Sequence, residues 1–257
     1  MNAMTAPFDM PLRRVLQVYL QEARSECLRY LRNPGFLVPT LCLPTVFYLM
    51  FGVVLGHANG ADAPRYLLAA YGTFGVMAPG MFGFGVSLAM EREGGLLMLK
   101  RALPMPPAAY LFGKMLMAML VAAMVVTLLL SIALFIAHVP LTTLQMLRLF
   151  GVDLFGVLPF CALGLLLGTL VKGQAGPALV NMIYLPMAFL SGLWFPLSIM
   201  PKVLQQLAPV WPSYHLNQLA LAAVGFDRGA VWPNALALCA FTAIFLLLAV
   251  RRLRRHG

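Results

Sequence analysis

Residues 91–114 read EREGGLLMLKRALPMPPAAYLFGK and separate two long apolar runs. Four basic side chains in the stretch are balanced by only two acids, Glu91 and Glu93. The pair Gly94-Gly95 can end a preceding helix, and three prolines, at positions 104, 106 and 107, stop any helix that begins after the pair. The stretch is therefore predicted to be a short structured connection at a membrane surface.

The leucines of this connection follow helical spacing. Leu96, Leu99 and Leu103 stand at i, i+3 and i+7, Leu97 lies beside them, and Lys100 and Arg101 flank the stripe. A short helix with one apolar face in water fits the groove of a partner protein, whereas a solvated loop is the alternative. Burying a leucine is worth about 1.5–3 kcal/mol and an exposed ion pair under about 1 kcal/mol, so we expect the leucines to outweigh Lys100.

The composition is that of a polytopic membrane protein. Of 257 residues, 61% are hydrophobic and 10% are charged, and the mean hydropathy is +0.87. Soluble domains have about 25% charged residues. The net charge of +10 lies beside apolar runs, where positive charge sets topology, so nucleic acid is not expected as a partner. The histidines are scattered, and neither a metal nor a cofactor site is expected in this chain.

The expected fold is all-α, with one membrane domain over residues 1–257. An amphipathic helix at 12–32, suited to the lipid headgroup region, precedes a six-helix membrane region at 36–250. The six spans are expected at about 36–55, 66–90, 109–137, 149–171, 177–193 and 232–250. Glycines in the second span, at positions 72, 75, 80, 83 and 85, permit close helix packing.

The segment 191–225 is too broken by prolines to span and too apolar to lie in water. We expect a partly re-entrant hairpin of two short helices, at about 200–208 and 214–224, with Ser213 as N-cap of the second and Gly225 past its end. Six spans place both termini on one side. That side carries 14 Lys and Arg residues, including a basic tail at 251–257, against 4 on the other. The positive-inside rule predicts cytoplasmic termini, with residues 91–114 inside and the hairpin outside.

Three blocks of residues resemble ABC-2 type permeases, the membrane subunits of ABC transporters. The first is Glu91-Arg92-Glu93-Gly94-Gly95 followed by Leu97, Pro104 and Gly113-Lys114. The second is Ser191-Gly192, Phe195-Pro196 and Pro201 with Pro212 and Tyr214, and the third is Glu26 with Arg32-Asn33-Pro34. Their order and spacing extend from residue 26 to about 225, and Met98 departs from the polar residue that the family often has there.

The resemblance implies the permease of a type V, ABCG-like exporter in the cell membrane, and the expected membrane is a bacterial inner membrane. The helix at 12–32 would be the connecting helix, and residues around 92–103 the coupling helix that docks on a separate ATPase. The permease would pair with a second copy, as a homodimer, and two ATPase subunits would supply ATP and Mg. The residues implied in ATPase coupling are Glu91, Arg92, Glu93, Gly94, Leu96, Leu97, Leu99, Lys100 and Leu103.

The chain lacks the phosphate-binding pattern G-x-x-x-x-G-K-[ST], so it is not expected to be an enzyme or to hydrolyse ATP by itself. Candidates for a translocation path or gate are Asn181, Ser191, Phe195 and Tyr214, although Asn181 also suits a hydrogen bond between helices. Asp153 is the one acid expected inside a span, either functional or reached by interfacial water. Two other classes remain: a secondary transporter, which would need coupling-ion carboxylates, and an intramembrane serine hydrolase at Ser191. The cargo would be an amphiphile such as a drug, lipid or glycan.

Overall fold

The computed structural model describes residues 11–56, 60, 62–96, 99–100, 106–171, 173–227 and 229–256. Every regular element in these ranges is helical. The longer α-helices are α1 (Leu12–Leu31), α2 (Pro34–Phe47), α3 (Ala63–Gly80), α6 (Pro107–Phe135), α7 (Thr143–Gly156), α8 (Leu158–Leu170), α9 (Gly176–Leu190), α11 (Pro212–Ala223) and α12 (Trp232–His256). Two π-helical segments, η1 (Tyr48–Val54) and η2 (Met81–Val86), continue α2 and α3, and α4 (Ser87–Glu93) follows η2.

Among the described residues, five helical runs are long and apolar enough to cross a membrane: Pro34–Val54, Ala63–Glu93, Ala108–Phe135, Thr143–Leu170 and Trp232–Arg252. They match five of the six predicted spans, and the chain is a multi-pass membrane protein. The predicted fifth span corresponds to α9, which has 15 residues. A helix of that length extends about 22 Å, less than the ~30 Å of a hydrocarbon core, so α9 alone does not make a sixth full span.

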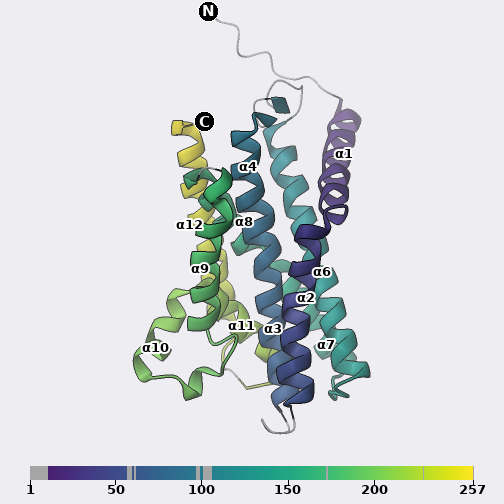
Figure 1. Cartoon of the computed structure of the whole chain (residues 1–257), viewed down its shortest axis with the longest axis vertical. Helices are drawn as coiled ribbons and strands as arrows, with labels where there is room; N and C mark the ends of the chain where they lie inside the picture. The colour runs from purple at the N-terminus through teal and green to yellow at the C-terminus, as the bar shows by residue number, and fades with distance from the viewer. Residues whose placement is uncertain are drawn as a thin grey trace, which may run out of the picture.

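The helices form an elongated bundle around the run from α3 to α4 (Figure 1). This run packs against α2, α6, α8 and α11, and most of its side chains are buried. The helix α1 packs along α6, and α12 packs against α8 and α11. Figure 1 shows α1 and the C-terminal end of α12 at the same end of the bundle, while α10 (Lys202–Leu207) and the start of α3 lie toward the other end.

Glycine contacts bring α3 and η2 against α8. A Cβ built on Gly164 would lie 2.5 Å from the carbonyl oxygen of Gly80, and one built on Gly85 would lie 2.9 Å from the carbonyl oxygen of Gly164. Gly168 approaches the carbonyl oxygen of Gly85 in the same way, at 2.7 Å. Backbone therefore meets backbone, which confirms the predicted role of these second-span glycines in close packing.

The predicted hairpin contains three short elements before α11: η4 (Leu197–Ile199), α10 and η5 (Ala208–Val210). Gly225 follows α11 with φ of +97°, as predicted. The expectation that Ser213 is the N-cap was wrong, because Trp211 occupies that position. The Ser213 hydroxyl instead lies 2.5 Å from the Ser191 hydroxyl and donates to the carbonyl oxygen of Met187 at 3.4 Å, which joins α11 to the end of α9.

Two boundaries differ from the sequence prediction. The fourth crossing begins at Thr143 rather than 149, because Thr142 and Gln145 form a capping box in which each side chain hydrogen-bonds the other's backbone N–H. At the C-terminus, α12 continues through the expected basic tail as far as His256. Arginines have high helix propensity, so the helix need not end where the apolar run ends.

The glycine contacts give a matched test of packing. Gly164→Ala places a Cβ against the backbone of η2, so we expect a loss of about 1–3 kcal/mol in the free energy of unfolding. Gly151→Ala, in α7, meets no atom within 4 Å and should be neutral or slightly stabilising. Unfolding midpoints of the purified variants in detergent measure both. Equal stability of the two variants would contradict the close packing.

Candidate functional site

The candidate site is a cluster of ion pairs where α1, α4 and α6 meet, referred to below as the ion-pair cluster. Its acids are Glu22 and Glu26 of α1 and Glu91 of α4, and its bases are Arg29 of α1, Lys100, and Lys114 of α6. The three acids and three bases balance in charge. Gly113 lets α6 approach α1 closely, since a Cβ there would lie 3.3 Å from the backbone nitrogen of Ala23 in α1.

Lys114 is the centre of the cluster and is fully buried. Its ammonium Nζ lies 3.2 Å from Oε2 of Glu26 and 3.0 Å from Oε1 of Glu91. It also donates to the hydroxyl of Ser87 at 2.7 Å. A buried ammonium is tolerated only when its charge is paired and its donors are used, and here all three N–H donors have a partner.

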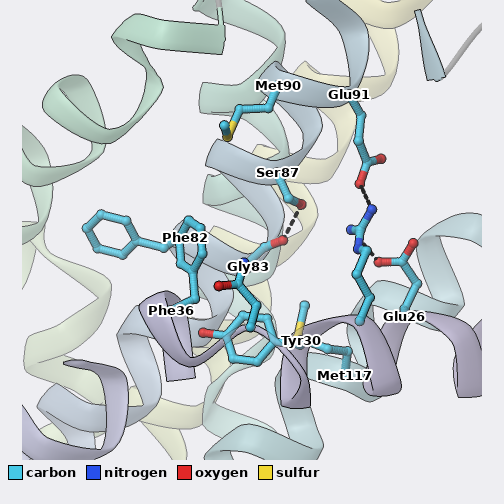
Figure 2. A pocket seen from close by; sticks show the side chains of 11 residues that line it. Glu26, Tyr30, Phe36, Phe82, Gly83, Ser87, Met90, Glu91 and Met117 are labelled. Atoms are coloured by element: carbon cyan, nitrogen blue, oxygen red, sulfur yellow. Dashed lines mark hydrogen bonds and ion pairs between the residues drawn. The ribbon is translucent and has the colours of Figure 1, made fainter. Parts of the chain in front are cut away.

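Arg29 closes the ion pairs into a ring. Its guanidinium lies 2.7 Å from Oε2 of Glu26 and 2.6 Å from Oε1 of Glu91, the same two oxygens that bind Lys114. Figure 2 shows Glu26 and Glu91 on one side of the pocket, approaching from different helices. Burial opposes the charge of Arg29, but Glu26 and Glu91 outweigh it and raise its pKa. The ring therefore holds α1 to both α4 and α6.

Lys100 extends the cluster toward the connection between α4 and α6. Its ammonium pairs with Glu22 and with Oε1 of Glu26, the latter at 3.0 Å, and lies 4.6 Å from the ring centroid of Tyr110. Tyr110 in turn donates its hydroxyl to Glu91. Burial opposes the charge of Lys100, and the bonds to both glutamates outweigh it and raise the pKa. Its contribution to stability is therefore complete at neutral pH and is lost only when alkaline pH deprotonates the amine.

A pocket of about 200 Å³ adjoins the cluster. Figure 2 shows Phe36 and Phe82 on the side opposite Glu26 and Glu91, with Tyr30 and Met117 at its base. The acids on its wall are already paired, and no nucleophile and base face each other among the residues that line it. In the described part of the chain no three His, Cys, Asp or Glu side chains are grouped as metal ligands. The arrangement is suited to holding helices together rather than to bond-making chemistry.

The predicted ATPase-coupling residues divide into two groups. Glu91 is buried in the cluster, and Arg92 donates to the carbonyl oxygens of Gly168 and Thr169 at the end of α8, at 3.2 and 3.1 Å. Leu99 is 64% exposed, Leu96 is half-buried, and Glu93 and Gly94 are exposed. Leu97 and Leu103 lie outside the described residues. Lys100 is not the solvated flank that the sequence suggested, because its side chain is 16% exposed and paired twice.

The predicted path and gate residues do not lie together. Asn181 is exposed and lines a groove of about 300 Å³ between α2 and α9. Ser191 is buried and bonded to Ser213, whereas Phe195 is 45% exposed and Tyr214 is half-buried. Asp153 is fully buried, so the alternative of a water-reached aspartate was wrong. Its carboxylate lies against Gly72, and neither oxygen has a hydrogen-bond partner among the described residues.

Comparison with known proteins identifies the family. A sequence model of ABC-2 type transporters matches residues 19–225, which include the whole ion-pair cluster. The chain belongs to the ABC-2 type transporter family. This ABC-2 permease is 29% identical over 239 residues to YvfS of Bacillus subtilis (strain 168), named as a candidate transport permease, and the match covers 91% of this chain and 96% of YvfS. It is 31% identical over 180 residues to the inner membrane transport permease YhhJ of Escherichia coli (strain K12), which covers 66% of this chain and 46% of YhhJ.

Glu91 and Lys114 belong to one of the three motif blocks of the permease and Glu26 to another, but the sequence did not predict that the three side chains meet. It also missed the roles of Glu22, Arg29 and Tyr110. One signal was available: Lys114 lies within the apolar run 108–135, where a charge needs a partner. The nearest acids in sequence, Glu91 and Glu93, offered one partner, and the second, Glu26, is 88 residues away.

The cluster predicts a large effect of Lys114→Met on stability. Removing the ammonium leaves Glu26 and Glu91 with only Arg29 between them, and breaking a buried ion pair costs about 3–5 kcal/mol. The control is Lys202→Met, at an exposed lysine of α10, which should change stability little. The double variant Glu91→Gln/Lys114→Met should lose less than the sum of its single variants. Unfolding in detergent measures all four, and additive losses would contradict the buried ring.

Proposed function

We propose that this ABC-2 permease is the membrane subunit of an ATP-driven exporter of type V, ABCG-like architecture. A separate ATPase, present in two copies, binds ATP and Mg and docks on the connection between α4 and α6. Two permease copies, as a homodimer, enclose the path of an amphiphilic cargo, and alternating access moves the cargo outward. The family membership and the names of the relatives support a transport role.

The observation that carries this proposal is the ion-pair cluster. The cluster joins α1 to α4, which leads into the segment 91–114, and to α6, in which that segment ends. A displacement of this segment therefore reaches three helices together, because each buried charge is held by partners on another element. Beside the cluster, Leu99 is 64% exposed, so an apolar side chain stands where a partner can bury it.

The proposed topology has six crossings and cytoplasmic termini, with α9 and the hairpin of η4, α10 and η5 together forming the fifth crossing. The shared position of α1 and the end of α12 in Figure 1 supports an even number of crossings. The basic side chains of the ion-pair cluster and of α12 lie at this end, which the positive-inside rule assigns to the cytoplasm. The setting would be a bacterial inner membrane.

The path is proposed along the groove between α2 and α9. Met182, Leu185 and Phe189 of α9 are exposed apolar side chains, as are Val38 and Leu43 of α2. Asn181 lines this groove together with Thr40 and Tyr184, and it would meet the path when a second copy faces it. Phe195 and Tyr214 remain gate residues in the proposal, whereas the buried bond between Ser191 and Ser213 assigns Ser191 to positioning α11.

A secondary transporter is the second candidate, and Asp153 is the observation that favours it. A fully buried carboxyl without a hydrogen-bond partner in the described part of the chain is the group that such a protein would use for a coupling ion. One experiment on reconstituted permease distinguishes the two mechanisms. Export by a secondary transporter would follow an ion gradient without the ATPase, whereas export by the proposed ABC exporter would require the ATPase and ATP.

The exposed leucine predicts a docking defect. Leu99→Asp places a charge where the ATPase would bury an apolar side chain, and we expect at least tenfold weaker ATPase binding with insertion and folding unchanged. Leu207→Asp is the matched control, because Leu207 is also an exposed leucine but lies in α10, toward the other end. Co-purification of the ATPase with each variant measures the effect. If both variants retain the ATPase equally, Leu99 is not part of the docking surface.

Lys100→Ala separates docking from transmission. It removes the ion pairs with Glu22 and Glu26 but leaves the leucines in place. We expect the ATPase to remain bound while ATP-driven export slows, because α1 is released from the segment. The measurements are co-purification and export by proteoliposomes. Loss of ATPase from this variant would show that Lys100 contacts the partner directly, contrary to the proposal.

Topology is tested with single cysteines in a background without the four native ones. A membrane-impermeant maleimide added to intact cells should label Lys202→Cys and miss Glu93→Cys, since both side chains are exposed but lie at opposite ends of the bundle. If only Glu93→Cys is labelled, the orientation is opposite to the one proposed, with the termini outside. Labelling of both after permeabilisation shows that each thiol is accessible.

A further inference from the structure

A second pocket lies at the end of the bundle away from the ion-pair cluster. Its volume is about 510 Å³, within the range of sites for drug-sized ligands. It is bounded by the end of η1, the start of α3, the turn after α9 and the chain after α11. The side chains on which the argument rests are five aromatic ones and one acid: Phe51, Tyr66, Trp194, Phe195, Phe226 and Asp62.

The chemistry of this pocket is aromatic with one charge. Asp62 is the single charged side chain among the residues that line it, and it is exposed. Aromatic ring faces carry partial negative charge and attract cations, and a carboxylate adds to that attraction. Arg65 is directed over the ring of Phe226, with its guanidinium carbon 5.7 Å from the centroid. In this contact one face of the Phe226 ring already binds a delocalised cation, the guanidinium of Arg65.

Trp194 adds a ring that is fixed by its neighbours. Its indole Nε1 is buried and has no hydrogen-bond partner among the described residues, although the ring packs edge-on against Phe47, Phe74 and Phe189. Because this nitrogen is enclosed by protein, the indole contributes its ring, and not its N–H, to the wall of the pocket. The pocket therefore offers ring faces and an acid for a cationic group and an apolar wall for a hydrophobic body.

We propose that this pocket binds an organic cation with an apolar, aromatic body. The site would hold such a molecule at the outer end of the permease, and Phe195, 45% exposed, would cover it in part. The inference rests on the proposed export function only for the direction in which the ligand leaves. Binding itself needs neither the ATPase nor ATP, so it is measured on the permease alone.

The test uses Trp194 as its reporter. The chain has three tryptophans, so Trp211→Phe/Trp232→Phe leaves Trp194 as the only one. Tetraphenylphosphonium and tetraphenylborate are the probes, because they have the same shape and opposite charge. In detergent, tetraphenylphosphonium should change Trp194 fluorescence saturably and more strongly than tetraphenylborate at equal concentration, with empty micelles subtracted. Equal binding of the two ions, or tighter binding of the anion, would overturn the proposal.

Two variants locate the site in this reporter background. Asp62→Asn should weaken tetraphenylphosphonium binding by about three- to fivefold and leave tetraphenylborate unchanged or slightly tighter. Asp227→Asn is the control, since Asp227 is an exposed acid in the connection from α11 to α12 that bonds the backbone of Gly229 and does not line the pocket. An equal effect of the two variants would show general surface charge rather than a site.

Phe195→Leu keeps an apolar side chain but removes the ring. It should weaken binding of tetraphenylphosphonium more than binding of tetraphenylborate. Phe195→Tyr, which keeps an aromatic ring, should bind tetraphenylphosphonium as the unchanged protein does. If Phe195→Leu changes neither ion, the aromatic wall is not the site. These outcomes are independent of export: loss of ATP-driven transport with intact binding would contradict the proposed function alone, and loss of binding selectivity with intact transport would contradict this inference alone.

Discussion

The structure depends on one buried ammonium. Lys114 is fully enclosed, and its charge is tolerated because Glu26 and Glu91 reach it from two other helices. Arg29 binds the same two carboxylate oxygens, so the four side chains form a closed ring. Losing Glu26, Glu91 or Lys114 leaves an uncompensated charge away from water, which costs several kcal/mol. The position of α1 is thereby fixed by electrostatics as well as by packing, and the narrow approach at Gly113 allows the helices to come close enough for the ring to form.

The cluster and the aromatic pocket at the other end of the bundle are joined by a single element. The run Ala63–Glu93 extends from the pocket, which Ala63, Tyr66 and Leu67 line, to Glu91 in the cluster. Its middle is the π-helical segment η2, which meets α8 through backbone contacts at Gly85 and Gly164. π-helical turns within helices are frequent at functional sites. Because the run is helical throughout and packed on several sides, a rotation at the cluster end would be transmitted along it rather than absorbed locally.

Much of this fold was predictable from the sequence. The apolar runs gave five of the spans, the glycines of the second span predicted its close packing, and Gly94 and Gly225 marked two helix ends. The predicted fifth span, 177–193, extends three residues past the end of α9, because the apolar composition continues into the turn after Leu190. Ser213 was misassigned because a serine before a helical pattern has the N-cap signature, whereas its hydroxyl is used by Ser191. The ring around Lys114 joins residues 23 and 88 positions apart, and local spacing carries no information about such pairs.

Ion pairs are not the most economical way to stabilise three helices in a bundle. Apolar side chains of similar volume commonly give equal or greater stability than a buried ion pair. An apolar contact, however, tolerates sliding, whereas the ring holds Glu26, Glu91 and Lys114 in one register through directional bonds. Its location beside Leu99, which is 64% exposed, gives that register a use. In the proposed function, force from the ATPase would enter at this connection, and a joint held by directional bonds would pass that force to three helices at once.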